Sequence, residues 1–311
     1  MALILITGAR GAIGRGTVAL AKARGHTVIG LGHGAWSGDS GLPPIDRWFN
    51  GEIDSDNLDA LAHASGTPDI IIHLAGGSLV GPSISHPGED FRRTVESSQR
   101  LLLWMRASAP AARLVVASSA AIYGDGHTGP IPEIAAASPT SPYGTHKAIM
   151  EMLCRSFARD FGLNIALLRL FSVYGQGLRK QLIWDLAARL HRRESPIVLG
   201  GTGEETRDFL YVDDAAAMLL DAAGQADQTA PAFNGCSGQA TRIAALTGAV
   251  ARAFSTGAPA FSGQSRQGDP VHLVGDARRS QAAGLIAATG LEEGLVRTIR
   301  WIKGELATAG R

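Results

Sequence analysis

Tyr143 and Lys147 stand four residues apart and could together carry acid/base chemistry. Ser141 and Pro142 directly before them form a helix start, with Ser as the N-cap and Pro at the first helical position. The two side chains therefore share one helix face. A lysine cation beside a phenol favours the phenolate and lowers the pKa of the tyrosine. The spacing predicts Tyr143 as a general acid/base for a hydroxyl or carbonyl; the alternative is a surface Lys147 that pairs with Glu151.

Ser118 and Ser119 close the apolar run Arg113–Ser118. Ligands of open α/β sheets bind beyond the carboxyl ends of the strands, so a serine there can hydrogen-bond a reacting oxygen. Alone, such a serine would be an ordinary turn residue. With Tyr143 and Lys147 following it, we favour a catalytic role.

Gly8, Gly11 and Gly14 form a GxxGxxG turn between the apolar run Ala2–Thr7 and a helical stretch. Glycines there allow a tight turn and close approach of the backbone to a diphosphate, which the helix N-terminus then binds. The position after the first strand predicts a dinucleotide site, against the alternative of a purely structural turn. No Gly-Lys-Ser/Thr follows, which excludes a Walker P-loop.

The second apolar run, Thr27–Leu31, continues into Gly32 and His33 without an acidic residue. An acid at this point normally binds the 2′-hydroxyl of the adenosine ribose. With Arg10 inside the glycine turn, the pattern suits a 2′-phosphate. We therefore expect NAD or NADP as cofactor, with NADP favoured by Arg10, Gly32 and His33.

Apolar runs alternate with helical stretches through the first half of the chain. The runs show no polar alternation, which is typical of strands buried on both faces of a parallel sheet. The predicted strands are Ala2–Thr7, Thr27–Leu31, Asp69–Leu74, Arg113–Ser118 and Asn164–Leu170, and the predicted helices are Arg15–Arg24, Asp90–Ala107 and Pro142–Phe161. We predict an α/β fold with a doubly wound parallel sheet, a Rossmann dinucleotide-binding domain, over residues 1–171.

The pattern loosens beyond this point. Residues 195–206 and 255–270 are rich in Gly and Pro and are expected to be loops, whereas Gln181–Arg193 is expected to be a helix. We predict a smaller, irregular C-terminal substrate-binding lobe over residues 172–311. A segment near residues 205–235 is expected to return to the Rossmann domain, with Phe209–Val212 as a candidate strand of the main sheet.

The composition narrows the function. The 311 residues carry a net charge of +1, so no general attraction to nucleic acid or to anionic membranes is expected. No apolar stretch approaches the ~18 residues of a membrane span, and no signal peptide is evident. Cys154 and Cys236 form no disulfide framework, which favours the cytoplasm. The histidines show no metal-binding motif, and His73 is expected to be a packed core residue.

Several blocks together resemble the extended short-chain dehydrogenase/reductase family, in its NAD-dependent epimerase/dehydratase branch. The resemblance covers nearly the whole chain. The matching blocks are TGARGAIG at Thr7–Gly14, HLAG at His73–Gly76, SSAAIYG at Ser118–Gly124, SPYGTHK at Ser141–Lys147, LRLFSVYG at Leu168–Gly175 and RDFLYVDD at Arg207–Asp214.

This resemblance implies residue roles. It implies Ser119, Tyr143 and Lys147 as the catalytic triad and a nucleoside-diphosphate sugar as substrate. It implies substrate contacts from Ser119, Ser172, Arg207 and Arg266, and Asn234 matches a family landmark in the second lobe. The implied cofactor residues are Gly8, Arg10, Gly11, Ile13, Gly14, His33, Glu52, Ile53, Leu74, Ala75, Gly76, Ser118, Tyr143, Lys147, Leu170 and Val173.

Departures from the family pattern narrow the reaction. Ala120 and Ala121 stand where the family's 4,6-dehydratases carry an Asp-Glu pair, so the acid and base for eliminating water are missing. Ser172 and Thr94 each replace an Asn, and Gly32 replaces the ribose-binding Asp.

We therefore expect a nucleotide-sugar 4-epimerase that acts through a transient 4-keto sugar. The alternative is an NADPH-dependent 4-keto-sugar nucleotide reductase that uses the same three residues. A third hypothesis, a redox-sensing NAD(P)-binding protein without catalysis, is disfavoured by the intact triad. A homodimer is expected, because the segments Asp90–Ala107 and Pro142–Phe161 resemble the family's two interface helices.

Overall fold

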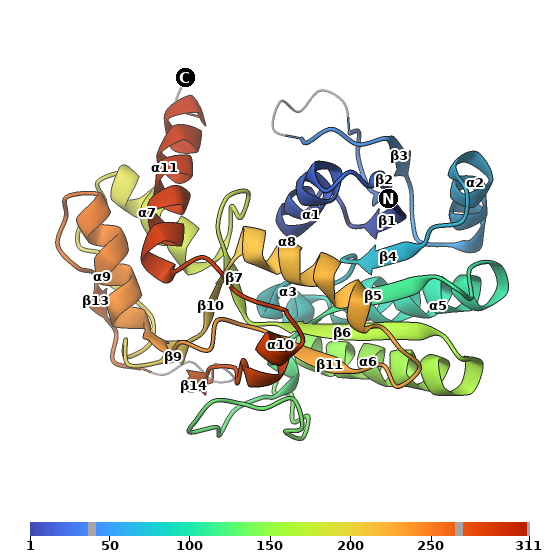
Figure 1. The fold of residues 1–311 in the computed structure, drawn as a ribbon. Helices are drawn as coiled ribbons and strands as arrows, with labels where there is room; N and C mark the ends of the chain where they lie inside the picture. Colours follow the sequence, from blue (N-terminus) through green and yellow to red (C-terminus); the bar gives the residue numbers. More distant parts are fainter. Residues whose placement is uncertain (37–41, 265–269, 310–311) are drawn as a thin grey trace.

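The larger of two lobes contains a seven-stranded parallel sheet between two layers of helices (Figure 1). The structure is a computed structural model that describes residues 1–36, 42–264 and 270–309. The strand order is β11-β6-β5-β4-β1-β2-β3. The strands are β1 (Leu3–Thr7), β2 (Thr27–Gly32), β3 (Arg47–Asn50), β4 (Ile70–His73), β5 (Arg113–Ser119), β6 (Asn164–Leu170) and β11 (Ala232–Gly235). The predicted doubly wound fold with a smaller C-terminal lobe is confirmed.

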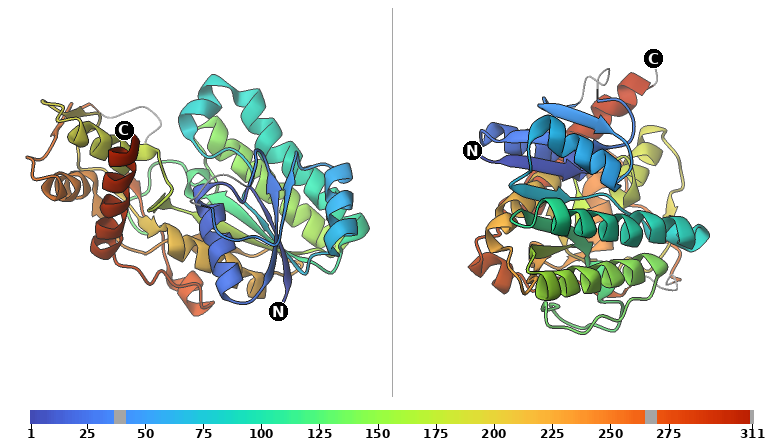
Figure 2. Two further views of the ribbon diagram at one scale, coloured as in Figure 1. Left: turned by 90° about the horizontal axis from the view of Figure 1, so that it is seen from above. Right: turned by 90° about the vertical axis from the view of Figure 1, so that its right-hand side faces the viewer.

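Both faces of the sheet are buried, as the unalternating runs predict. On β1, Ile4 and Ile6 pack into one core and Leu5 into the other. The first core is covered by α1 (Ala12–Ala23) and α8 (Val212–Asp221), and the second by α2 (Ser55–Ser65), α5 (Ser97–Ser108) and α6 (Pro142–Phe161). Figure 2 shows these helices on the two sides of the sheet.

Local signals set the helix ends that matter for the site. Ser141 is the N-cap of α6 and accepts a hydrogen bond from the N–H of Gly144 at 3.2 Å, and Pro142 is the first helical residue. Gly162 ends α6 in the left-handed conformation, with a φ of 70°. No helix of the described residues is long and apolar enough to cross a membrane.

Two predicted elements differ from the structure. The stretch Asp90–Ala107 is not one regular helix: α4 (Pro87–Phe91) ends at its start, a π-helical turn follows over Arg92–Glu96, and then comes α5. A further short helix, α3 (Val80–Ser85), precedes α4. The prediction that Phe209–Val212 joins the main sheet is wrong. β10 (Phe209–Tyr211) pairs with β7 (Ser172–Tyr174) in a separate sheet, because β11 takes the edge beside β6.

The second lobe combines helices with very short strands. Its helices are α7 (Gln181–His191), α9 (Ile243–Ala253) and α11 (Leu291–Ala309), whereas α10 (Arg278–Ala282) packs on β11 of the main sheet. Its strands are β8 (Val198–Leu199), β9 (Thr206–Arg207), β12 (Thr241–Arg242), β13 (Ala260–Phe261) and β14 (His272–Leu273). Within residues 205–235 the chain returns to the Rossmann half as α8 and β11.

Candidate active site

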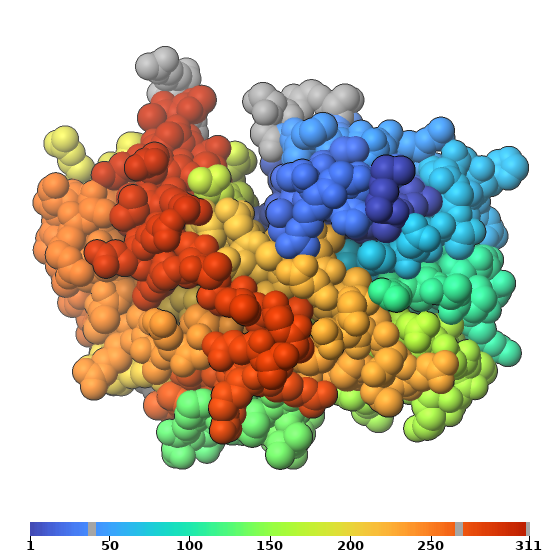
Figure 3. Space-filling view, in the orientation of Figure 1, coloured from blue at the N-terminus to red at the C-terminus, as the bar shows by residue number. Residues whose placement is uncertain are grey.

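A cavity of about 1300 Å³ lies between the two lobes. Figure 3 shows a hollow between the N-terminal part of the Rossmann half, in blue, and the C-terminal lobe, in orange and red. Every predicted cofactor residue lines this cavity, and so do Ser119, Ser172 and Arg207 of the predicted substrate residues. Arg266, the fourth predicted substrate residue, lies outside the described residues.

The glycine turn between β1 and α1 leaves no room for a Cβ at Gly8 or Gly14. Gly8 has a φ of +71°, and a Cβ there would lie 2.9 Å from the backbone nitrogen of Ala75. A Cβ at Gly14 would lie 2.5 Å from the carbonyl oxygen of Gly8. Gly11 is the N-cap of α1 and offers no side-chain acceptor to the N–H groups of the first turn. The turn is a cradle of backbone donors at a helix N-terminus, which fits the diphosphate of a dinucleotide.

Charged side chains gather where β2 and β3 end. Arg10 Nη1 donates to the carbonyl oxygen of His33 at 3.3 Å, and its buried Nε has no partner among the described residues. Glu52 Oε1 lies 3.6 Å from His33 Nε2 and 3.3 Å from Arg92 Nη1. The NADP prediction counted the two bases, Arg10 and His33, and did not weigh the charge of Glu52. A carboxylate here repels a 2′-phosphate, so the charge pattern does not single out NADP.

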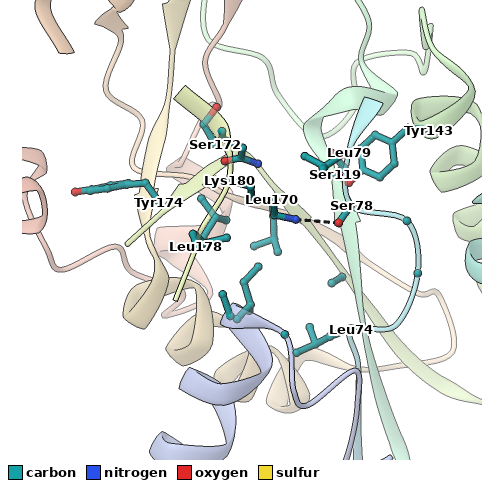
Figure 4. Close-up of a pocket in the computed structure, with 18 of the residues that line it drawn as sticks. Leu74, Ser78, Leu79, Ser119, Tyr143, Leu170, Ser172, Tyr174, Leu178 and Lys180 are labelled. Carbon is teal, nitrogen blue, oxygen red and sulfur yellow. Dashed lines mark hydrogen bonds between the residues drawn. The ribbon is translucent and has the colours of Figure 1, made fainter. Parts of the chain in front are cut away.

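The three predicted catalytic side chains come from two neighbouring elements on one side of the cavity. Ser119 is the last residue of β5, and its Oγ accepts a hydrogen bond from the N–H of Ala121 at 3.1 Å. Tyr143 and Lys147 lie one turn apart on α6. Figure 4 shows Ser119 beside Tyr143. A Cβ at Gly144 would lie 2.5 Å from the carbonyl oxygen of Ala121, so the close contact between α6 and the end of β5 requires glycine there.

The electrostatics of this pair differ from the prediction. Burial lowers the pKa of Lys147 to about 8, against the opposing charges of Asp90 and Glu151. Its Nζ donates to the carbonyl oxygen of Ala117 at 2.8 Å. Burial raises the pKa of Tyr143, hydrogen bonding with Ser119 opposes that rise, and the charge of Asp90 adds to it. The prediction that Lys147 lowers the pKa of Tyr143 is wrong in this structure, because the ammonium binds a backbone carbonyl and the phenol is desolvated.

The alternative role for Lys147, a surface pair with Glu151, is also wrong. Lys147 is 4% exposed, and Glu151 holds Arg169 through two hydrogen bonds of 2.8 and 3.0 Å. Arg169 Nη1 also donates to the hydroxyl of Tyr123, which donates to Asn234 Oδ1 at 2.6 Å. This buried network joins α6, β6 and β11. Asn234 therefore has a structural place in the Rossmann half and not in the second lobe.

His73 is a core residue, as expected. It is 1% exposed, and its ring nitrogens bond the hydroxyls of Thr7 at 2.8 Å and Ser98 at 3.0 Å. Burial lowers its pKa to about 3, so the ring stays neutral. Cys154 and Cys236 are free and buried. No cluster of three or more His, Cys, Asp or Glu side chains in the described ranges could hold a metal ion.

Two polar features near the triad were missed from the sequence. Asp90 Oδ2 and His146 Nδ1 are 2.6 Å apart, and both residues are less than a tenth exposed. Lys180 reaches across the cavity and donates to Ser78 Oγ at 2.9 Å. His146 lies inside the Tyr-x-x-x-Lys segment and Lys180 follows the LRLFSVYG block, so both adjoin recognised motifs. Their partners, however, are 56 and 102 residues away in the chain.

Comparison with protein families gives one match of wide extent. Residues 4–234 match the NAD dependent epimerase/dehydratase family. A curated relative named putative UDP-glucose 4-epimerase, from Methanocaldococcus jannaschii, is 26% identical over 310 residues, which are 98% of this chain and 100% of that protein.

Solved structures agree with this match. The structure of MoeE5 in complex with UDP-glucuronic acid and NAD is 31% identical, covers 97% of this chain and 99% of that one, and has a TM-score of 0.86. UDP-glucose 4-epimerase of Thermotoga maritima, solved with UDP-glucose, is 27% identical, covers 98% and 99% of the two chains, and has a TM-score of 0.89. The whole architecture, with both lobes, is thus shared with these proteins.

Proposed function

Because this chain belongs to the NAD dependent epimerase/dehydratase family, we propose that it is a nucleotide-sugar 4-epimerase that acts through a transient 4-keto sugar. UDP-hexoses are the proposed substrates, since the similar proteins are named for UDP-glucose or were solved with UDP-glucose or UDP-glucuronic acid. The proposal extends to residue roles, which rest on the geometry of the cavity.

Tyr143 is the proposed acid/base. Its Oη takes the proton of the sugar 4-hydroxyl as the C4–O bond becomes a carbonyl, and returns it to the same oxygen after the sugar has turned. Ser119 donates a hydrogen bond to that oxygen and holds it next to Tyr143. Lys147 is anchored on the carbonyl oxygen of Ala117, one helical turn after Tyr143. A nicotinamide dinucleotide, when bound, supplies the acceptor and donor of the C4 hydride and a positively charged ring that favours the phenolate.

The observation that carries the proposal is the set of side chains that lines the catalytic side of the cavity. Ser119, Tyr143 and Lys147 line one cavity with the glycine turn, while Ala120 and Ala121 follow Ser119 without an acidic side chain. This wall can move one proton and position one oxygen. It has no carboxylic acid directly after Ser119 to protonate a leaving hydroxyl.

The test is turnover on a panel of sugar nucleotides. We expect UDP-glucose, UDP-N-acetylglucosamine or UDP-glucuronate to be converted to its 4-epimer, detected by chromatography or NMR. The absorbance of reduced nicotinamide should show no net change, because the hydride returns within each turnover. Tyr143→Phe protein run in parallel controls for contaminating activity.

The second candidate is a 4-keto-sugar nucleotide reductase that consumes NADPH. The pattern of Arg10, Gly32 and His33 favours it. Stoichiometric oxidation of NADPH with a 4-keto-6-deoxy sugar nucleotide, without exchange between UDP-sugar epimers, would replace the epimerase proposal by this one. Binding of dinucleotide without turnover of any substrate would support the sensor hypothesis instead.

We propose NAD as the cofactor, since the NADP preference has no support among the similar structures, which include complexes with NAD. Glu52 beside His33 supports the choice, because its carboxylate disfavours a 2′-phosphate. Titration should show tighter binding of NAD than of NADP, and Glu52→Gln should narrow the difference. Tighter binding of NADP than of NAD to the wild-type protein would contradict this proposal and support the NADP preference predicted from Arg10 and His33.

A homodimer through α5 and α6 remains our proposal. The two helices lie side by side on one face of the molecule (Figure 2, right). Leu103 on α5 is 47% exposed, and Met152 and Phe161 on α6 are 70% and 42% exposed. Light scattering should give twice the chain mass at micromolar concentration, and the double variant Leu103→Glu, Met152→Lys should give a monomer. Wild-type protein that is monomeric at that concentration would contradict the proposal.

A further inference from the structure

Lys180 belongs to the second lobe, and its ammonium group contacts the first lobe. It is the N-cap residue of α7, and its Nζ donates to Ser78 Oγ at 2.9 Å. Ser78 lies in the loop after β4, two residues beyond Gly76, in the Rossmann half. Figure 4 shows this bond crossing the cavity below Ser119 and Tyr143. Lys180 is therefore a direct polar bridge between the two walls.

The neighbouring cation is arranged in the opposite way. Arg179 pairs with the carboxylate of Glu305 on α11, and its side chain is 63% exposed. Lys180 is half-buried, and burial alone lowers its pKa, without an opposing carboxylate in the described part of the chain. Its only hydrogen-bond partner there is the neutral hydroxyl of Ser78. A half-buried ammonium that meets no anion is ready to accept one from a ligand.

The position of Lys180 identifies the ligand chemistry. The loop that carries it packs on the start of α1, because a Cβ at Gly177 would lie 3.3 Å from Ala12 Cβ. On its other side, Ser78 follows the predicted cofactor residues Leu74, Ala75 and Gly76. Lys180 thus lies between the glycine turn and the loop after β4, and both line the same cavity. An anion bound at the N-terminus of α1 would be within the region that this loop encloses.

We propose that Lys180 binds the diphosphate of the bound dinucleotide from the second lobe. On binding, its ammonium gives up the hydrogen bond to Ser78 and donates to a phosphate oxygen instead. The inference rests on the proposed dinucleotide site at the glycine turn. Because Lys180 belongs to one lobe and the glycine turn to the other, the contact links cofactor retention to the distance between the lobes. The diphosphate of the sugar nucleotide offers the same chemistry, so the experiment must separate the two sources.

The experiment compares binding to full-length Lys180→Met and Arg179→Met proteins by calorimetry. Lys180→Met removes the charge and keeps most of the side-chain volume, and Arg179→Met is the matched loss of the adjacent cation. We expect Lys180→Met to weaken the binding of NAD and of ADP-ribose by about 10-fold to 100-fold. Binding of adenosine, which has no diphosphate, and of UDP should change less than about threefold. Arg179→Met should match wild type for all four ligands.

Three further measurements keep the result interpretable. Lys180→Arg retains the charge and should recover most of the affinity for ADP-ribose, and its melting temperature and that of Lys180→Met report whether each variant is folded. The salt dependence of ADP-ribose binding should be shallower in Lys180→Met than in wild type, since one phosphate contact is lost.

Three results would overturn the inference. Unchanged affinity of folded Lys180→Met for NAD and ADP-ribose would mean that Lys180 only bonds Ser78 and does not contact the diphosphate. Weakened binding of UDP with normal binding of ADP-ribose would assign the cation to the sugar nucleotide. Equal losses in Arg179→Met would indicate a general effect of surface charge. None of these readouts depends on turnover, so failure of the epimerase assay leaves the test intact, whereas a wild-type protein that binds neither NAD nor ADP-ribose would refute both.

Discussion

The two walls of the cavity are built by different physical means. The wall that carries Ser119, Tyr143 and Lys147 consists of long elements: β5 and β6 have seven residues each, and α6 has twenty. The opposite wall rests on strands of two or three residues, such as β7 and β9. Long strands with apolar side chains on both faces hold position by packing, whereas two-residue strands make too few backbone hydrogen bonds to do so.

Hydrogen bonds to two carboxylates fix the short strands of the second wall, beside the apolar core of its helices. Asp208 is fully buried, and it accepts hydrogen bonds from the N–H and hydroxyl of Ser237, both at 2.7 Å, and from the N–H of Gly238 at 2.8 Å. Glu205 likewise accepts from the N–H groups of Thr202 and Gly203, each at 2.8 Å. The difference teaches that the proton-transfer groups stand on long packed elements, whereas the substrate-side wall combines packed helices with very short strands that carboxylates fix.

The largest expected effect is on turnover, and it is tested by replacing one tyrosine with phenylalanine in each wall. Tyr143→Phe removes the proposed acid/base and should lower kcat by about 10²-fold to 10⁴-fold. Tyr174→Phe removes a hydroxyl on β7 that donates to the carbonyl oxygen of Leu291 at 3.3 Å, so only a small change is expected. Steady-state rates and NAD titrations of both variants make the comparison. Near-wild-type turnover by Tyr143→Phe would end the triad assignment.

The second effect concerns stability and should appear in the substrate-side wall. Asp208→Ala removes a fully buried carboxylate and leaves the N–H groups of Ser237 and Gly238 without their acceptor, which should cost about 2–5 kcal/mol of the free energy of unfolding. Asp185→Ala, a change of an exposed aspartate on α7, is the matched control and should cost less than about 0.5 kcal/mol. Urea unfolding measures both. If Asp208→Ala unfolds at the wild-type urea concentration, this carboxylate does not hold the wall together.

The smallest effect is a pH dependence of the rigid wall. The pKa of Lys147 is lowered from 10.5 to about 8, so between these values the unfolded chain keeps a proton that the native protein has lost. Wild-type stability therefore gains as pH rises from about 8 to 10.5 relative to Lys147→Met, which lacks this group. Urea unfolding across that window, with the exposed Lys303→Met as control, should show the slope only for the Lys147 comparison. Parallel profiles for wild type and Lys147→Met would contradict the lowered pKa.

The sequence alone determined the elements whose signals are local. The strands β1, β2, β4, β5 and β6 are continuous apolar runs, because both faces of each are buried, and such runs are visible without a neighbour. Ser141 and Pro142 predict the start of α6, and the spacing of Gly8, Gly11 and Gly14 predicts the glycine turn. From these local features most residues that line the cavity could also be predicted, since the carboxyl ends of parallel strands meet at one edge of a sheet.

The tertiary structure decided what depends on partners far apart in the chain. β3 and β11 have four residues each and polar residues among them, so only their pairing with β2 and β6 makes them strands. Lys147 was expected to act on its neighbour on the helix, but its ammonium binds Ala117, 30 residues away. Lys180 and Ser78 are separated by 102 residues. Periodicity and spacing describe the neighbours of a residue along one element, whereas the charge state and the partner of a buried side chain depend on what the fold packs against it.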